Sequence, residues 1–326
     1  MPTTDACHRR FAPGRAPVVL MVMLVLGLVA PAAAGPHENG EAAFARGDYA
    51  AALRWWRPAA DRGDAGAQAD LGTMYAVGLG VPQDDAAAAG WFRKAAEQGL
   101  AVAQIRLADM YRDGQGVARN YAEALRWFRK AADQGSPVAQ VGLADMYRDG
   151  LGVPQSYAQA LVWYRKAAEQ GDAWGELNLG VLYYNGRGVA QDYAEAARWS
   201  LKAADRGFAD AQFTVGLMDA TGRGLRQDYA AAAAWYGKAA DQAFADAQFN
   251  LGVLYYNGQG VPQDDVRAHM WFDLAAECYP AASADRRANA VKGRDTVAAR
   301  MTPAQLDRSG RLVREWLAAH AGAVQP

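Results

Sequence analysis

The amino-acid sequence repeats itself every 36 residues, and this short period limits the possible folds more than any other feature. Tryptophan keeps the spacing from Trp55 to Trp271 without missing a step. Fixed periods of this length are typical of repeat proteins, in which each unit packs mainly on its two neighbours. The string G-x-G, followed by Val or Leu, begins at the same spacing at Gly78, Gly114, Gly150, Gly186, Gly222 and Gly258.

Each repeat predicts two helices. Ala67, Leu71 and Tyr75 are spaced as i, i+4 and i+8, which places them on one face of a first helix. The G-x-G turn tolerates positive φ and so ends that helix, and Asp84 is an N-cap residue for a second helix, whose tryptophan has the register of a core position. One helix pair cannot bury its apolar residues alone, so the pairs must stack. The predicted fold class is therefore all-α, an α/α solenoid (superhelix) of two-helix repeats with C-terminal capping helices.

The N-terminal segment has the features of a secretory signal peptide. Arg9, Arg10 and Arg15 precede an unbroken apolar run at 18–30, and an A-x-A string ends at Ala34. We therefore expect cleavage after Ala34, a periplasmic or secreted protein, and no integral membrane segment in the mature chain. A retained anchor is the alternative, although the apolar run is short for a membrane span. The predicted organisation is a signal peptide at 1–34, a partial repeat at 35–63, six repeats at 64–279, capping helices at 280–320 and a tail at 321–326.

Composition argues against several classes of function. The chain has 34 Lys and Arg against 35 Asp and Glu, so it lacks the basic excess that nucleic-acid binding needs. Its two cysteines exclude a disulfide framework, and once Cys7 is removed with the signal peptide, Cys278 is expected to be a lone, inert thiol. His37, His269 and His320 are too far apart along the repeats to converge. We therefore expect no catalytic residue, no cofactor and no metal site.

Across about residues 38–279 the units read A-x-A-Q-x-x-L-G-x-M-Y-x-x-G-x-G-V-P-Q-D and then W-F-x-K-A-A-x-x-G. This pattern resembles the Sel-one-like repeat, a relative of the tetratricopeptide repeat. The resemblance implies non-catalytic adaptor proteins that assemble complexes or hold a protein or peptide partner in a groove. Secreted bacterial members of the family imply a role in the cell envelope. The oligomeric state stays open.

The resemblance also implies which residues line the concave groove. Positions equivalent to 69, 73, 76 and 77 share one face of each first helix. The groove would be charged in its first half and apolar or aromatic in its second, and a contiguous apolar patch usually marks a binding surface. The alternative is that contacts between successive first helices bury much of this face. The candidate groove residues are Asp109, Arg112, Asp113, Asp145, Arg148, Asp149, Leu177, Val181, Tyr184, Asn185, Phe213, Leu217, Phe249, Val253, Tyr256 and Asn257.

Two other functions are weighed against a protein-binding scaffold. One is a cell-wall or β-lactam-directed hydrolase, as cysteine-rich Sel-one-like relatives imply, but those carry a cysteine pair in each unit and this chain does not. The other is an envelope glycan-binding protein, which sequence alone does not separate from a protein-binding one. The recurrent G-x-G lacks the third glycine of a dinucleotide-binding loop and joins helix to helix.

The fifth complete unit departs from the others. Asp219 stands where five of the six units have a tyrosine, and Ala243 stands where most have a closing glycine. Either this unit has drifted or Asp219 opens a polar notch for a ligand. Ala243 is predicted to be held at positive φ, where glycine would be more stable.

Overall fold

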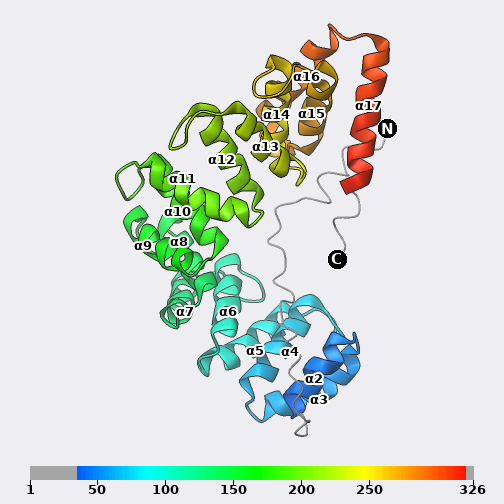
Figure 1. The fold of residues 1–326 in the computed structure, drawn as a ribbon. Coiled ribbons are helices and arrows are strands. Elements are labelled where there is room, and N and C mark those ends of the chain that lie inside the picture. The colour runs from blue at the N-terminus through cyan, green and yellow to red at the C-terminus, as the bar shows by residue number, and fades with distance from the viewer. Residues whose placement is uncertain (1–34, 321–326) are drawn as a thin grey trace, which may run out of the picture. The chain divides into compact units, whose positions relative to one another are not determined.

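The computed structural model describes residues 35–320, and in that range every regular element is a helix (Figure 1). Consecutive helix pairs pack on one another in repeats, which confirms the all-α solenoid of two-helix repeats. Within 35–320 no helix is both long enough and apolar enough to cross a bilayer. The predicted signal peptide and the C-terminal tail lie outside the described residues.

Each repeat consists of a first and a second helix. The first helices are α2 (Pro36–Ala45), α4 (Ala65–Val77), α6 (Ala101–Asp113), α8 (Pro137–Asp149), α10 (Ala173–Asn185), α12 (Ala209–Thr221) and α14 (Ala245–Asn257). The second helices are α3 (Tyr49–Asp61), α5 (Asp85–Glu97), α7 (Tyr121–Asp133), α9 (Tyr157–Glu169), α11 (Tyr193–Asp205), α13 (Tyr229–Ala240) and α15 (Asp265–Cys278). A short 3₁₀ helix, η1 (Ala281–Ser283), then leads to α16 (Ala284–Ala298) and α17 (Pro303–His320).

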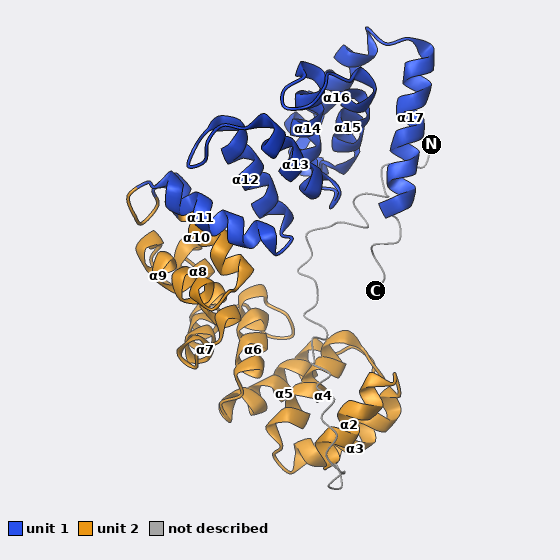
Figure 2. Cartoon of the chain, in the orientation of Figure 1, with its two compact units in different colours: residues 1–23, 183–186, 191–326 blue, residues 24–182, 187–190 orange. Residues whose placement is uncertain are grey.

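The described residues belong to two compact units (Figure 2). Unit 2 holds α2 to α9 and most of α10, up to Leu182, together with residues 187–190. Unit 1 holds residues 183–186 and everything from Gln191 onward.

Local sequence explains where the helices begin and end. The Asp84 side chain begins α5 by accepting a hydrogen bond from the backbone N–H of Ala87 at 2.9 Å, which satisfies one of the exposed donors of the first turn. Gly78 ends α4 with a φ of 77°, a left-handed conformation that costs glycine little. Ala243, in place of the closing glycine after α13, has a φ of 59°, so the predicted positive φ is confirmed.

In most repeats the core forms around a large residue that follows the register tryptophan, and Ser200 takes this place after Trp199. Phe92 and Phe128 in unit 2 and Tyr236 in unit 1 are almost fully buried. A Cβ atom on Gly72 would lie 2.8 Å from the Phe92 ring, closer than packed atoms allow. Glycine at this position therefore lets α4 approach α5 closely.

The register tryptophans themselves are not uniformly buried. Trp127 and Trp271 are buried, whereas Trp91 is half-buried and Trp55 is 45% exposed, so the prediction that the whole series is core is wrong. The following residue points into the core, which leaves the tryptophan at its edge. There the Nζ of Lys94 lies 3.9 Å from the Trp91 ring centre, a cation–π contact that recurs in four later repeats.

A buried glutamine joins most repeats to the one before it, and Glu176 takes its place on α10. Gln104 donates from Nε2 to the carbonyl of Ala96 in the preceding second helix at 3.1 Å, and its Oε1 accepts from Gln134 at 2.8 Å. Both bonds therefore satisfy an amide that is almost fully buried. The same arrangement holds Gln68 between Ala60 and Gln98, Gln140 between Ala132 and Gln170, and Gln212 between Ala204 and Gln242.

The last repeat breaks this pattern. Gln248 keeps its bond to the Ala240 carbonyl at 3.3 Å, but its Oε1 is buried and has no hydrogen-bond partner. Cys278 stands where the other repeats have the donor. The lone, inert thiol expected at Cys278 once residues 1–34 are removed stays a prediction.

Two C-terminal helices pack against the last repeat in unit 1. A Cβ on Gly293 of α16 would lie 3.1 Å from the Phe272 ring, so α16 docks closely on α15. Helix α17 also packs on α15, where the rings of Trp271 and Trp316 meet edge to face with centres 6.3 Å apart. The region that the sequence assigns to capping helices thus forms η1, α16 and α17.

Candidate functional site

A first cluster of charges lies at the C-terminal end of α6. The Arg112 guanidinium contacts Asp109 at 2.7 Å and Asp113 at 2.7 Å, and its carbon lies 5.8 Å from the Phe128 ring centre. The arginine side chain is only 11% exposed, whereas that of Asp113 is 44% exposed. The cluster therefore presents carboxylate to solvent and holds the guanidinium inward.

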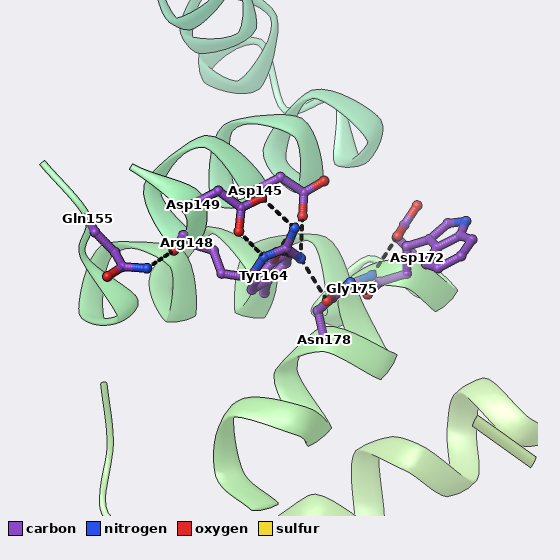
Figure 3. A network of polar contacts seen from close by, with 9 residues as sticks. Asp145, Arg148, Asp149, Gln155, Tyr164, Asp172, Gly175 and Asn178 are labelled. Carbon is purple, nitrogen blue, oxygen red and sulfur yellow. Dashed lines mark hydrogen bonds and ion pairs between the residues drawn. The ribbon is translucent and has the colours of Figure 1, made fainter. Parts of the chain in front are cut away.

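The next repeat builds a similar cluster with a larger network (Figure 3). Arg148 on α8 contacts Asp145 at 2.9 Å and Asp149 at 2.8 Å. It also donates to the hydroxyl of Tyr164 on α9 at 2.9 Å and to Oδ1 of Asn178 on α10 at 3.3 Å. The Arg148 side chain thereby joins three helices of unit 2.

Both arginines are held in the charged form. The hydrogen bond with Asp149 raises the pKa of Arg148 above its ordinary value despite burial. Burial acts to lower the pKa of Arg112, but the hydrogen bond with Asp113 and the charge of Asp109 raise it overall. Each cluster of two aspartates and one arginine has a formal charge of −1. We name these two groups, Asp109–Arg112–Asp113 and Asp145–Arg148–Asp149, the acidic clusters.

Several positions in the apolar half of the predicted groove are taken up by internal contacts. Phe213 packs on Phe244 with ring centres 5.2 Å apart, and Phe249 packs on Phe272 at 5.4 Å. Leu177 is buried. These contacts support the alternative that internal packing takes up part of this face.

The remaining predicted positions vary in exposure. Tyr184 meets Tyr193 edge to face and accepts a hydrogen bond from Arg223 at 3.0 Å. Tyr256 lies under the Arg300 guanidinium, 4.2 Å from it. The predicted residues up to Val181 belong to unit 2 and those from Tyr184 onward to unit 1. Leu217 and Val253 are half-buried, and Val181, Asn185 and Asn257 are exposed.

Sequence reasoning missed an exposed apolar row at the N-terminal ends of the helices that carry the acidic clusters and of α10. Val102 is 51% exposed, Val138 50% and Trp174 51%. They occupy the second position of α6, α8 and α10, which are the first helices of three consecutive repeats in unit 2. The sequence does show this row, as an apolar residue at the same register position in three successive repeats. Unit 1 has Asp210 and Asp246 at the equivalent positions.

Two histidines outside the acidic clusters, His37 and His269, each contact a polar side chain of another helix. His37 Nε2 lies 2.7 Å from Asp70 Oδ2, and this carboxylate raises the pKa of His37 against the opposing effect of burial. His269 Nδ1 lies 2.9 Å from the hydroxyl of Ser309 on α17, and burial lowers the pKa of His269. Among residues 35–320 no group of three His, Cys, Asp or Glu side chains is placed to hold a metal ion.

The replacement of tyrosine by Asp219 is accompanied by a second substitution at the same junction between repeats. In unit 2, Arg93 donates to the Tyr111 hydroxyl of the next repeat at 2.9 Å, and Arg57 does the same to Tyr75. At the junction before α12, Leu201 replaces that arginine and Asp219 replaces the tyrosine. The paired loss is what drift of one junction would produce.

Comparisons with known proteins agree with this architecture. The Sel1 repeat family model matches residues 35–64, 65–100, 101–136, 137–172, 175–208, 209–244 and 245–279. A Sel1 repeat protein from Oxalobacter formigenes is 34% identical with a TM-score of 0.69, and the match covers 74% of this chain and 99% of that one. The protein c5321, described as a protective antigen present in uropathogenic Escherichia coli strains with an SLR fold, is 32% identical with a TM-score of 0.55, over 88% of this chain and 69% of that one. The comparison with curated proteins finds no match. The chain belongs to the Sel1 repeat family, whose members are typically non-catalytic protein–protein interaction scaffolds.

Proposed function

We propose that this chain is a non-catalytic scaffold of the bacterial cell envelope that binds a protein partner through one face of α6, α8 and α10. The observation that carries the proposal is the apolar row Val102, Val138 and Trp174, about half exposed on three consecutive first helices. Single exposed apolar residues are ordinary on protein surfaces. Apolar side chains in one register along consecutive repeats lie on one face of the repeat array, and a contiguous apolar patch usually serves binding.

The acidic clusters give the same face a polar margin. Asp113 and Asp149 lie eleven positions after Val102 and Val138 on the same two helices, close to a whole number of turns. A face with an apolar strip and charged edges suits a partner of defined orientation, because charges favour one register over its alternatives.

The location in the cell envelope rests on two further observations. The sequence begins with the basic, apolar and A-x-A segments of a secretory signal. The similar protein c5321 is described as a protective antigen, which fits export of this chain as well. We expect the exported protein to begin at Gly35, and mass spectrometry of the N-terminal peptide would measure this. An intact N-terminus ahead of Gly35 would contradict the expected cleavage.

Site-specific crosslinking tests the binding face. A photoreactive amino acid replaces Val138 in the full chain, and a second protein carries it at Val162 on α9, which is 44% exposed but lies on a second helix. We expect the first protein to crosslink one partner in cells and the second to crosslink none. Equal crosslinking at both positions would contradict the proposed face. So would a partner complex that Val138→Ser leaves intact.

A further inference from the structure

We infer that the partner segment received by this face is a basic amphipathic helix, with its apolar side on the row Val102, Val138 and Trp174 and its basic flank on the acidic clusters. This inference rests on the proposed function and adds the chemistry of the partner. It comes from the width of the face, the position of the carboxylates and the contrast between the two units.

The width of the face fits one helix. Val102 and Asp113 are eleven residues apart on α6, which corresponds to about 16 Å along the helix axis. A helix with its side chains is about 10–12 Å across, and Lys or Arg side chains extend its reach. One helix lying across the repeats therefore contacts the apolar row on one side and the acidic clusters on the other.

The positions of the carboxylates favour a basic ligand. Asp113 is the last residue of α6 and Asp149 the last of α8. Carboxylates at a helix C-terminus are unfavourable, because the helix dipole is negative there. Their negative charge therefore adds to that of the helix ends, and each arginine is shared by two carboxylates. The ion pairs with Arg112 and Arg148 offset part of this cost, and the carboxylate charge that remains attracts a cationic segment.

Unit 1 provides the contrast within the same chain. At the helix ends equivalent to Asp113 and Asp149 it has Thr221 and Asn257, and in place of the apolar row it has aspartates. Its repeats fold in the same way without either feature. The combination of apolar row and acidic clusters is thus not a requirement of the repeat.

Binding of matched peptides to the purified full chain tests the inference. The probe is a fluorescent designed helix of roughly 18 residues, long enough for helical structure, with a leucine stripe and lysines along one flank. A second peptide replaces every lysine with glutamate, and a third contains the lysine peptide's residues in scrambled order. Fluorescence anisotropy at low and at high salt reports the Kd of each. We expect the lysine helix to bind at least about tenfold more tightly than the other two at low salt, and the difference to shrink as salt screens the charges.

Two variants and two matched controls locate the site. We expect Val138→Ser to weaken binding of the lysine helix about threefold to tenfold at both salt concentrations. Asp149→Asn should weaken it about threefold to fivefold, mainly at low salt. Val162→Ser, with a similarly exposed valine, and Asp133→Asn, at the exposed end of α7, should leave the Kd unchanged.

The outcomes separate this inference from the proposed function. If the glutamate helix binds as well as the lysine helix and Val138→Ser weakens both, the face binds helices but the inferred charge of the partner is wrong. If the scrambled peptide binds equally well, or the controls weaken binding as much as the variants, the attraction is non-specific and the inference is overturned. If the peptides fail to bind while crosslinking at position 138 succeeds, the partner has another chemistry and only the inference is lost.

Discussion

Replacing Ser200 with alanine is expected to stabilise the protein. Ser200 is 0% exposed on α11, and its hydroxyl has no hydrogen-bond partner. Burying an unbonded hydroxyl costs about 1–3 kcal/mol, and alanine adds a few tenths of a kcal/mol through its higher helix propensity. Loss of the oxygen atom leaves a small void that offsets up to about 1 kcal/mol of this gain. We therefore expect Ser200→Ala to raise the free energy of unfolding by about 1 kcal/mol.

Ser156→Ala is the matched control, and it should lower the free energy of unfolding. Ser156 caps α9, where its hydroxyl accepts a hydrogen bond from the backbone N–H of Gln159 at 3.3 Å. Removing such a cap costs about 1 kcal/mol. The two substitutions are chemically identical, so the sign of each change reports only the environment of the hydroxyl.

Urea unfolding followed by far-UV circular dichroism measures both changes. Hydrogen exchange of the α11 amides then shows whether the gain arises around Ser200. If Ser200→Ala lowers the free energy of unfolding as Ser156→Ala does, the buried hydroxyl is satisfied, for example by an internal water, and the reasoning is refuted.

Three further changes test local features of the repeats. Ala243→Gly relieves a non-glycine residue held at a φ of 59°, and although lost burial of its methyl group offsets part of this gain, the free energy of unfolding should rise by roughly 0.5 kcal/mol; no rise in Tm would contradict the cap assignment. Gly237→Ala on α13 should add about 0.5–1 kcal/mol, because a Cβ there meets no atom within 4 Å; a loss in urea unfolding would reveal a hidden contact. Burial lowers the pKa of His269, so the folded state binds fewer protons at this residue than the unfolded state does. The contribution of His269 to the free energy of unfolding should therefore fall as the pH drops below about 6.5, the ordinary histidine pKa. His269→Gln should remove that part of the pH dependence, and an unchanged profile in thermal unfolding between pH 5 and 8 would contradict the assignment.

Local signals predict the repeat and its helix ends because they act within a few residues. Asp84 and Gly78 cap and end their helices as their positions in the repeat indicate. The conformation of Ala243 follows from the same register, since each of the five preceding repeats places a left-handed glycine there.

The candidate site is harder to predict, because exposure depends on contacts between helices. The helical register of Trp55 suggests a core position, yet the neighbouring Trp56 is the buried residue. Phe213 and Val138 both belong to apolar patterns, but Phe213 packs on Phe244 while Val138 faces solvent. Periodicity gives the face of a helix, and only the packed structure gives what covers that face.

The buried glutamines have a consequence for how such a chain can change length. Gln104 needs a carbonyl from the preceding repeat and an amide from its own, and both must arrive at one fixed spacing. A slip of one or two residues within a repeat would leave a desolvated amide without partners at that junction. Whole repeats can therefore be gained or lost without disturbing the rest, whereas fractional insertions within a helix cannot, and evolution along this lineage is expected to proceed in steps of one complete module.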